Sequence, residues 1–300
     1  MVLESLVGPI AAEKRPWELF FLGLLFASVA MFLSLWIFRE QASLVMVFLT
    51  VIAAVPLMYK TIKLEEFKDT KINKETTLLK EHAKALSFFV ALFLGILLAF
   101  SIWYVFLPSD VVQATFSTQI QTIAAINAKI AANPVLGNAL ISSQSAIDTS
   151  SVSASNLFMQ IFSNNIKVLL FSIFFSFLFG AGAIFILTWN ASVISAAIGT
   201  FVRNNISMYA NEIGLFKIGG YFHIFSLGLL KYMIHGVPEI LAYFIGGLAG
   251  GIISVAIIKH DFGTKQFKHI LFDSLDLIVL AIVILFIAGL LEVFVTPILF

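Results

Sequence analysis

A histidine and a glutamate stand four residues apart inside a long apolar stretch of this chain. They are His235 and Glu239, and Pro238 lies between them in the segment 231–251. A charged side chain in the hydrocarbon interior of a membrane costs on the order of several kcal/mol, so ionisable residues there usually face other protein groups or a watery cavity. A spacing of four puts both side chains on one face of a helix. Glu239 is therefore the centre of the candidate site.

Other polar residues in apolar surroundings could supply the partner that a buried carboxyl group needs. We expect Glu239 to be buried and hydrogen-bonded to one of them, or to a trapped water. Pro238 should lie in the first turn of a helix, where proline is well tolerated. The positive end of the helix dipole would then favour the Glu239 carboxylate by roughly 0.3–1 kcal/mol, which offsets little of the burial cost. The predicted polar cluster consists of Asn190, His223, His235, Glu239 and Glu292.

A glycine-rich run follows Glu239, with the sequence GGLAGG at residues 246–251. Small residues let membrane helices approach closely, so this run predicts a packing face. An ion path lined by backbone groups is the alternative. The residues predicted to break helices or to pack them together are Gly236, Pro238, Gly246, Gly247, Gly250, Gly251 and Pro297.

The composition places these residues in a membrane. The chain has 300 residues, of which 60% are hydrophobic and 12% charged, whereas about 25% of the residues of a soluble domain are charged. A net charge of only +1 and the lack of cysteine indicate no nucleic-acid partner, no disulfide and no thiolate chemistry. We expect no cofactor, no bound metal and no catalytic residue.

Apolar runs of about 20 residues, the length that crosses a bilayer as a helix, predict an all-α polytopic fold. We expect about six full spans, one or two short, broken or re-entrant helices, and a small helical external segment. The clear runs are residues 17–38, 42–59, 87–107, 166–188, 239–258 and 271–299. Two shorter segments, 191–208 and 222–234, lie between the spans 166–188 and 239–258. The first of these spans ends inside and the second must begin outside, so only one of the two segments can cross the membrane. We expect the first to cross and the second to dip into the membrane and return, with Gly236 and Pro238 as the break.

Lysine-rich connections stay on the cytoplasmic side of a membrane, and residues 60–86 carry seven lysines. This predicts a cytoplasmic N-terminus and an external position for residues 109–165. The expected organisation is an amphipathic segment and transmembrane hairpin (1–60), a cytoplasmic lysine-rich helical linker (61–86) and a transmembrane domain (87–300) that carries the external helical insert 109–165. We interpret the charged linker as a solvated helix between two spans, although a site for anionic lipid or a partner is the alternative.

Three features together resemble the stage II sporulation protein M family. They are Asn190 after an apolar span, the sequence HGVPEI at 235–240, and the sequence GLLEVFVTP at 289–297. The likeness covers residues 81–300, and the N-terminal hairpin is similar to the archaeal form of the family. The family pattern usually has Asn-Gly where this chain has Asn190-Ala191. The resemblance implies a polytopic membrane protein that, in sporulating bacteria, scaffolds peptidoglycan hydrolases during engulfment.

Three classes of function fit these residues. The first is a non-enzymatic scaffold or membrane organiser, in which the buried polar residues pair with one another and fix the helices. The second is a channel or transporter, in which Glu239, His235 and Glu292 line a path between broken helices. The third is a membrane-embedded hydrolase with a metal on His235 and Glu239, which is disfavoured because a catalytic zinc normally has three protein ligands. The lipid bilayer, possible protein partners in the membrane and a second copy in a homodimer are the expected partners.

Overall fold

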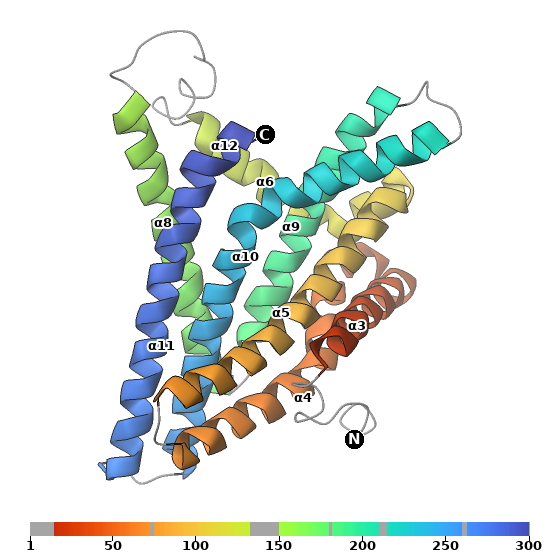
Figure 1. Ribbon diagram of the computed structural model, residues 1–300. Helices are drawn as coiled ribbons and strands as arrows, with labels where there is room; N and C mark the ends of the chain where they lie inside the picture. The colour runs from red at the N-terminus through yellow and green to blue at the C-terminus, as the bar shows by residue number, and fades with distance from the viewer. Residues whose placement is uncertain are drawn as a thin grey trace.

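The computed structural model describes residues 15–72, 75–132, 150–179, 182–209, 215–259 and 263–299, and in these ranges it contains helices and turns but no strand (Figure 1). Seven of the helices are long and apolar enough to cross a membrane. The prediction of a polytopic helical membrane protein is therefore confirmed. The amphipathic segment expected before the first span lies outside the described residues.

The helices follow one another along the chain. They are α3 (Pro16–Ile37), α4 (Ala42–Lys71), α5 (Glu75–Phe106), α6 (Ser109–Ala132), α8 (Ser150–Phe179), α9 (Ala183–Asn205), α10 (Leu215–Lys259), α11 (Lys265–Leu290) and α12 (Thr296–Leu299), with the short 3-10 helices η1 (Arg39–Gln41) and η2 (Ile206–Tyr209) and the π-helical turn η3 (Leu291–Val295).

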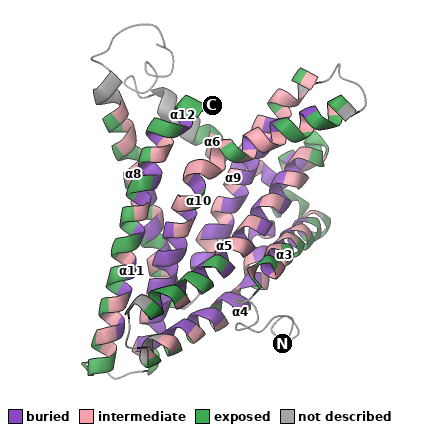
Figure 2. Ribbon diagram, in the orientation of Figure 1, coloured by how far each residue is buried: buried purple, intermediate pink, exposed green. Residues whose placement is uncertain are grey.

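Helix α10 is the centre of the bundle. In its most apolar part 83% of the residues are buried, whereas the corresponding value for α11 is 28%. Figure 2 shows the same contrast, with buried residues gathered on α5, α9 and α10 and exposed residues along the outer faces of α8 and α11. The apolar outer faces are those that a bilayer would cover.

The two lysine-rich parts of the chain share one end of the bundle. At this end lie the end of α4, the start of α5, the end of α10 and the start of α11, whereas α6 and α12 lie at the opposite end (Figure 1). An ion pair of 2.7 Å between Lys259 of α10 and Glu66 of α4 joins the two parts directly. This common end is what the distribution of lysines predicts.

The prediction of a re-entrant segment is wrong. Residues 222–234 belong to α10, a single helix of 45 residues, and residues 191–205 belong to α9, which begins at Ala183. The preceding span also ends earlier than expected, because α8 stops at Phe179. A side chain at Gly182 would come within 2.3 Å of the Phe175 carbonyl oxygen, so the close turn between α8 and α9 requires glycine here. Apolar character located the membrane segments but not this turn.

Pro238 bends α10 without ending it. Proline removes one backbone hydrogen bond and crowds the carbonyl group four residues earlier, which kinks a helix. In membranes such kinks are tolerated because neighbouring groups satisfy the freed carbonyl. Figure 1 shows α10 changing direction partway along its length. At 1.5 Å per residue its 45 residues extend over about 67 Å, roughly twice the thickness of the hydrocarbon core.

The lysine-rich segment is not a separate solvated linker. Its first part continues α4 to Lys71, and its last part forms the first turns of α5 from Glu75. Three of its ionisable side chains are almost completely buried: Glu65 is 0% exposed, Glu66 1% and His82 2%. The interpretation of this stretch as a solvated helix does not hold for these three side chains, because the end of α4 and the first turns of α5 pack against each other.

The segment expected to be external begins with α6, which packs against the bundle. Gln119 of α6 is fully buried, and its side-chain amide donates hydrogen bonds to the backbone carbonyl of Ser43 at 3.0 Å and to Ser192 Oγ at 3.2 Å. Helix α6 is kinked at Phe116, whose backbone angles are not helical. The last part of the predicted insert is the first half of α8.

Glycines bring α3 and α5 into backbone contact. A Cβ atom on Gly95 would lie 2.0 Å from the Phe20 carbonyl oxygen, and one on Gly23 would lie 2.3 Å from the Leu92 carbonyl oxygen. The two helices thus interlock through reciprocal positions that only glycine can occupy. The N-terminal hairpin is an integral part of the bundle.

Candidate functional site

Glu239 lies in the middle of α10 and not at a helix start. The helix extends from Leu215 to Lys259 with Pro238 inside it, so no free N-terminal backbone amides face the carboxyl group. The expected contribution from a helix dipole therefore does not apply at this position. The burial of Glu239 has to be compensated by side chains.

The hydrogen-bond partner of Glu239 is Tyr243. The tyrosine hydroxyl donates to Glu239 Oε1 over 2.6 Å, and its ring is among the most deeply buried side chains. This partner is four residues later on the same helix, whereas we expected Asn190, His223, His235 or Glu292. A separation of four residues, which places two side chains on one face of a helix, could have indicated this partner, because it applies to Tyr243 as well as to His235.

His235 connects α10 to the C-terminal helix. Its Nδ1 atom lies 3.2 Å from the hydroxyl of Thr296 in α12. The Thr296 hydroxyl itself donates to the Leu291 carbonyl over 3.1 Å. A hydroxyl has a single proton to donate, so the geometry assigns the proton of the first contact to His235 Nδ1, with Thr296 as acceptor.

Glu292 completes this group of side chains. It lies in η3, close enough to the Glu239 carboxyl group and the Tyr243 hydroxyl group for their charges to influence one another. In the described ranges neither Glu239 nor Glu292 forms an ion pair with a lysine, arginine or histidine. We call this group the central cluster; its members are Asn190, His235, Glu239, Tyr243, Glu292 and Thr296.

A cavity of about 100 Å³ opens beside Glu239 between α9 and α10. Gly236 contributes to this space, since a Cβ atom added there would meet only the end of the Met233 side chain, at 3.5 Å. The side-chain nitrogen of Asn190 is buried and has no hydrogen-bond partner among the residues that the structure describes. The cavity is lined by Asn190, Val193, Ile194, Tyr232, His235, Gly236, Glu239 and Ile240.

The structure brings together four of the five predicted polar residues but not the fifth. His223 lies on the exposed first part of α10, where its Nδ1 atom is 3.2 Å from the Tyr209 hydroxyl. Its position follows from the continuity of α10, which places it more than three helical turns from His235. Pro297 is exposed on α12, and Gly251 is buried in α10.

The glycine-rich run lies where α10 packs against α8 and the start of α9. Added Cβ atoms would come within 2.4 Å of the Leu169 side chain at Gly246, 2.6 Å of the Ala183 Cβ at Gly247 and 2.4 Å of the Ile173 carbonyl oxygen at Gly250. These distances leave no room for side chains. The run therefore brings α10 against α8 and α9 on the C-terminal side of Glu239 and Tyr243.

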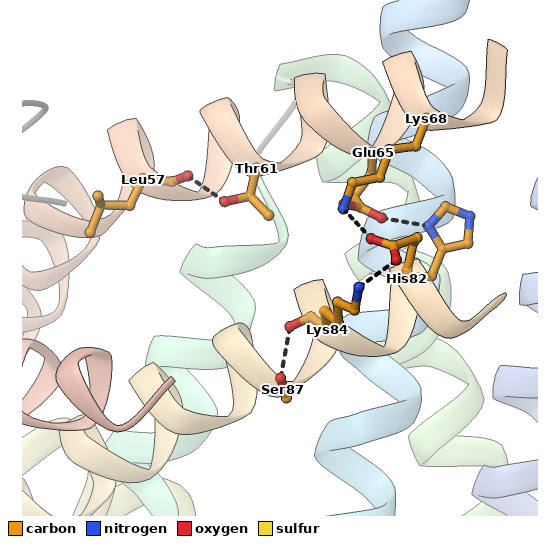
Figure 3. A network of polar contacts seen from close by, with 8 residues as sticks. Leu57, Thr61, Glu65, Lys68, His82, Lys84 and Ser87 are labelled. Atoms are coloured by element: carbon orange, nitrogen blue, oxygen red, sulfur yellow. Dashed lines mark hydrogen bonds and ion pairs between the residues drawn. The ribbon is translucent and has the colours of Figure 1, made fainter. Parts of the chain in front are cut away.

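A second group of polar side chains lies at the lysine-rich end and was missed in the sequence. Figure 3 shows Glu65 of α4 between His82 of α5 and Lys68, with contacts of 2.8 and 2.7 Å. Lys68 also reaches Glu81 at 3.2 Å, and Lys84 pairs with Glu81. We call these residues, together with the Glu66–Lys259 pair, the end cluster.

Helical periodicity could have indicated the end cluster. Buried residues recur along α4 at Ala54, Met58, Ile62 and Glu65, a spacing of three or four that continues the buried face into the charged segment. The seven neighbouring lysines hid this signal. A cavity of about 280 Å³ lies beside His82, between the first turns of α5 and the middle of α11.

No three histidine, aspartate or glutamate side chains in the part of the chain that the structure describes are arranged to hold a metal ion together. The central cluster consists of hydroxyl, amide, imidazole and carboxyl groups on α9, α10 and the C-terminal helices. Such groups can bind water, a proton or a small polar molecule, and they can fix the positions of helices.

Comparison with known proteins identifies the larger part of the chain. The family model described as Stage II sporulation protein M matches residues 83–297, which is well over half of the sequence and includes the whole central cluster. No curated protein and no solved structure matches the chain. The match begins inside α5, so α3 and α4 precede it.

Proposed function

The chain belongs to the stage II sporulation protein M family, and we propose that it acts as a non-enzymatic scaffold that organises other components in the membrane. Its seven apolar helices make it a multi-pass membrane protein. The observation that carries the proposal is the use of the central cluster as a connection between helices. His235 of α10 bonds to Thr296 of α12 at 3.2 Å, and Tyr243 satisfies Glu239 at 2.6 Å.

The rest of the bundle supports the same role. The end cluster joins α4 to α5 and to α10 through buried carboxylates, and interlocked glycines join α3 to α5. The ion pairs of the end cluster and the His235–Thr296 contact of the central cluster thus connect helices to one another. A rigid bundle that presents fixed surfaces to partners is what a scaffold requires.

The proposal includes an orientation. The N-terminus and the end cluster face the cytoplasm, and residues 109–165 lie on the outside, because lysine-rich connections stay inside. A cysteine-free chain allows this to be tested by labelling single cysteines on intact cells. Labelling from outside at position 71, with protection at position 143, would reverse the orientation.

We further propose that two copies associate. The glycine-rich helices permit close packing, and long apolar faces on α3 and α11 remain exposed. Crosslinking in native membranes followed by mass measurement tests this. A monomer of 33.0 kDa alone, with no crosslinked species, contradicts it.

Two substitutions of Glu239 test the scaffold role. Gln retains the shape and the acceptor oxygen for Tyr243 while removing the charge, whereas Ala removes both. A scaffold predicts that the Glu239→Gln variant folds, resists heat and complements a deletion strain like the parent, while Glu239→Ala loses stability. A Gln variant that folds normally but does not complement would contradict a purely structural role.

The cavity beside Glu239 favours transport of a small solute as a second candidate function. Its wall carries Glu239, His235 and the unpartnered amide nitrogen of Asn190, and ionisable residues within membrane segments commonly mark a path. Purified protein in vesicles that contain a pH-sensitive dye tests proton movement directly. Flux that Glu239→Gln abolishes supports transport; vesicles no leakier than protein-free ones oppose it.

A further inference from the structure

We propose that the cavity between α9 and α10 is a binding site for a short aliphatic ammonium ion that also carries an oxygen acceptor, as a small amino alcohol does. The proposal goes beyond the scaffold role and does not require transport. It rests on three observations about the cavity: the carboxyl groups at its wall, the amide nitrogen of Asn190, and the size and apolar lining of the space.

The carboxyl groups favour a cation. Glu239 lines the cavity, and Glu292 interacts with it electrostatically. Neither makes an ion pair with a basic side chain in the ranges that the structure describes. Two carboxyl groups in a membrane interior need a positive charge or a proton nearby. Only one oxygen of Glu239 receives the Tyr243 hydroxyl, so the other can accept from a bound ammonium group.

The amide of Asn190 favours an oxygen acceptor on the same molecule. Its Nδ2 atom is buried without a hydrogen-bond partner in the described part of the chain, and a buried donor left unsatisfied is costly. A bare alkali ion or a simple alkylammonium ion would leave this donor unmet. A ligand with a hydroxyl or carbonyl oxygen a few bonds from its nitrogen can satisfy Asn190 and Glu239 together.

The size and the apolar wall favour a short carbon chain. The cavity has about 100 Å³, roughly the volume that three water molecules occupy in the liquid. Val193, Ile194 and Ile240 form its apolar side. Gly236 leaves the space open, because a Cβ atom there would contact only Met233, at 3.5 Å. A molecule of about four or five non-hydrogen atoms therefore fits.

Three probes of equal size separate these contributions. They are ethanolamine, which has both groups, n-propylamine, which lacks the oxygen, and 1-propanol, which lacks the charge. Binding is measured by calorimetry on the full chain in discs of lipid without amine headgroups. We expect ethanolamine to bind about tenfold more tightly than n-propylamine and 1-propanol to bind most weakly.

Four variants assign the contacts, and a fifth serves as control. Asn190→Ala should remove the preference for ethanolamine over n-propylamine. Glu239→Gln should weaken both amines by a similar factor. Gly236→Val should fill the cavity and abolish binding of all three probes, and Gly236→Ala provides a milder version. His223→Gln, an exposed change on the same helix, should alter nothing. Melting temperature and elution volume verify that each variant is folded.

The proposal is overturned if the three probes bind alike, or if Gly236→Val does not affect binding in a folded protein; the cavity then holds water only. Discs that contain phosphatidylethanolamine distinguish two sources of the same chemistry. Competition by this lipid against ethanolamine assigns a lipid headgroup, and lack of competition assigns a free amine. The scaffold role is judged separately by complementation, so either proposal can fail without the other.

Discussion

The end cluster and the central cluster hold carboxyl groups inside the same helical bundle by different means. In the end cluster Glu65 contacts a lysine and a histidine, and Glu66 contacts Lys259. In the central cluster the Glu239 carboxyl receives a tyrosine hydroxyl, and the His235 ring contacts a threonine hydroxyl. The first is an arrangement of opposite charges; the second is an arrangement of neutral donors around acids.

The difference follows from access to water. In the end cluster the side chain of Lys259 is 42% exposed, although its partner Glu66 is only 1% exposed. A long basic side chain can keep its head group hydrated while it reaches a buried acid, so in this pair only the acid loses its water. The partners of Glu65 are less exposed, with 14% for Lys68 and 3% for His82. In the central cluster no ion pair of this kind is present among the described residues, and hydroxyl groups satisfy acceptors without adding a second charge.

Glu65→Ala should have the largest effect on stability. It removes the carboxylate that His82 and Lys68 share in a fully buried position, and breaking a buried ion pair costs about 3–5 kcal/mol. Unfolding in a denaturing detergent series measures the change. Asp110→Asn is the control, because its pair with Arg39 is long and more than two-thirds exposed on each side. If both variants unfold alike, the end cluster is not a structural element.

A charge exchange between Glu66 and Lys259 should have the next largest effect. Each single change, Glu66→Lys or Lys259→Glu, places like charges against each other across the 2.7 Å contact between α4 and α10. The double variant restores opposite charges and should recover about 1 kcal/mol or more of the lost stability. The same detergent series on the four proteins gives the coupling. Strictly additive losses would show that the pair is incidental.

Tyr243→Phe should have a smaller effect in the central cluster. It deletes the hydroxyl that donates to Glu239 at 2.6 Å and leaves the ring in place, and loss of one such bond costs about 1 kcal/mol. Tyr209→Phe is a matched control, since its hydroxyl contacts the exposed His223. Thermal melting compares the two. An equal response would mean that Glu239 does not depend on this donor.

Thr296→Val should have the smallest effect of the four. It removes the hydroxyl that accepts from His235 and donates to the Leu291 carbonyl, and hydrogen bonds between membrane helices average about 0.6 kcal/mol. Thr296→Ser should restore the melting temperature of the parent, because it keeps the hydroxyl. Failure of Ser to restore it would assign the effect to packing of the methyl group.

The sequence was sufficient for the class of fold because the length and apolarity of a run decide whether a helix can cross a bilayer. The same property does not mark where helices end within the membrane. The turn at Gly182 was missed for this reason, and Pro238 suggested a break where the helix continues with a bend.

The candidate site was predicted in part. Glu239, His235, Asn190 and Glu292 stand out as polar residues among apolar ones, and the structure gathers them. Tyr243 and Thr296 were not recognised, because tyrosine and threonine are common in apolar helices and their hydroxyl contacts depend on folding. The end cluster was missed because a run of lysines usually indicates solvent, and the packing of α4 against α5 overrides that tendency.

The bend in α10 gives the helix the mechanics of a lever. From Leu215 to Pro238 the helix extends over about 35 Å at 1.5 Å per residue. A change of about 10° at the proline would therefore move the far tip by about 6 Å, while Glu239, one residue beyond Pro238, would hardly move. Small rotations beside the central cluster are thus amplified at the tip of the arm. Conversely, a large displacement of the Leu215 end of α10 would produce only a small displacement at the walls of the cavity beside Pro238.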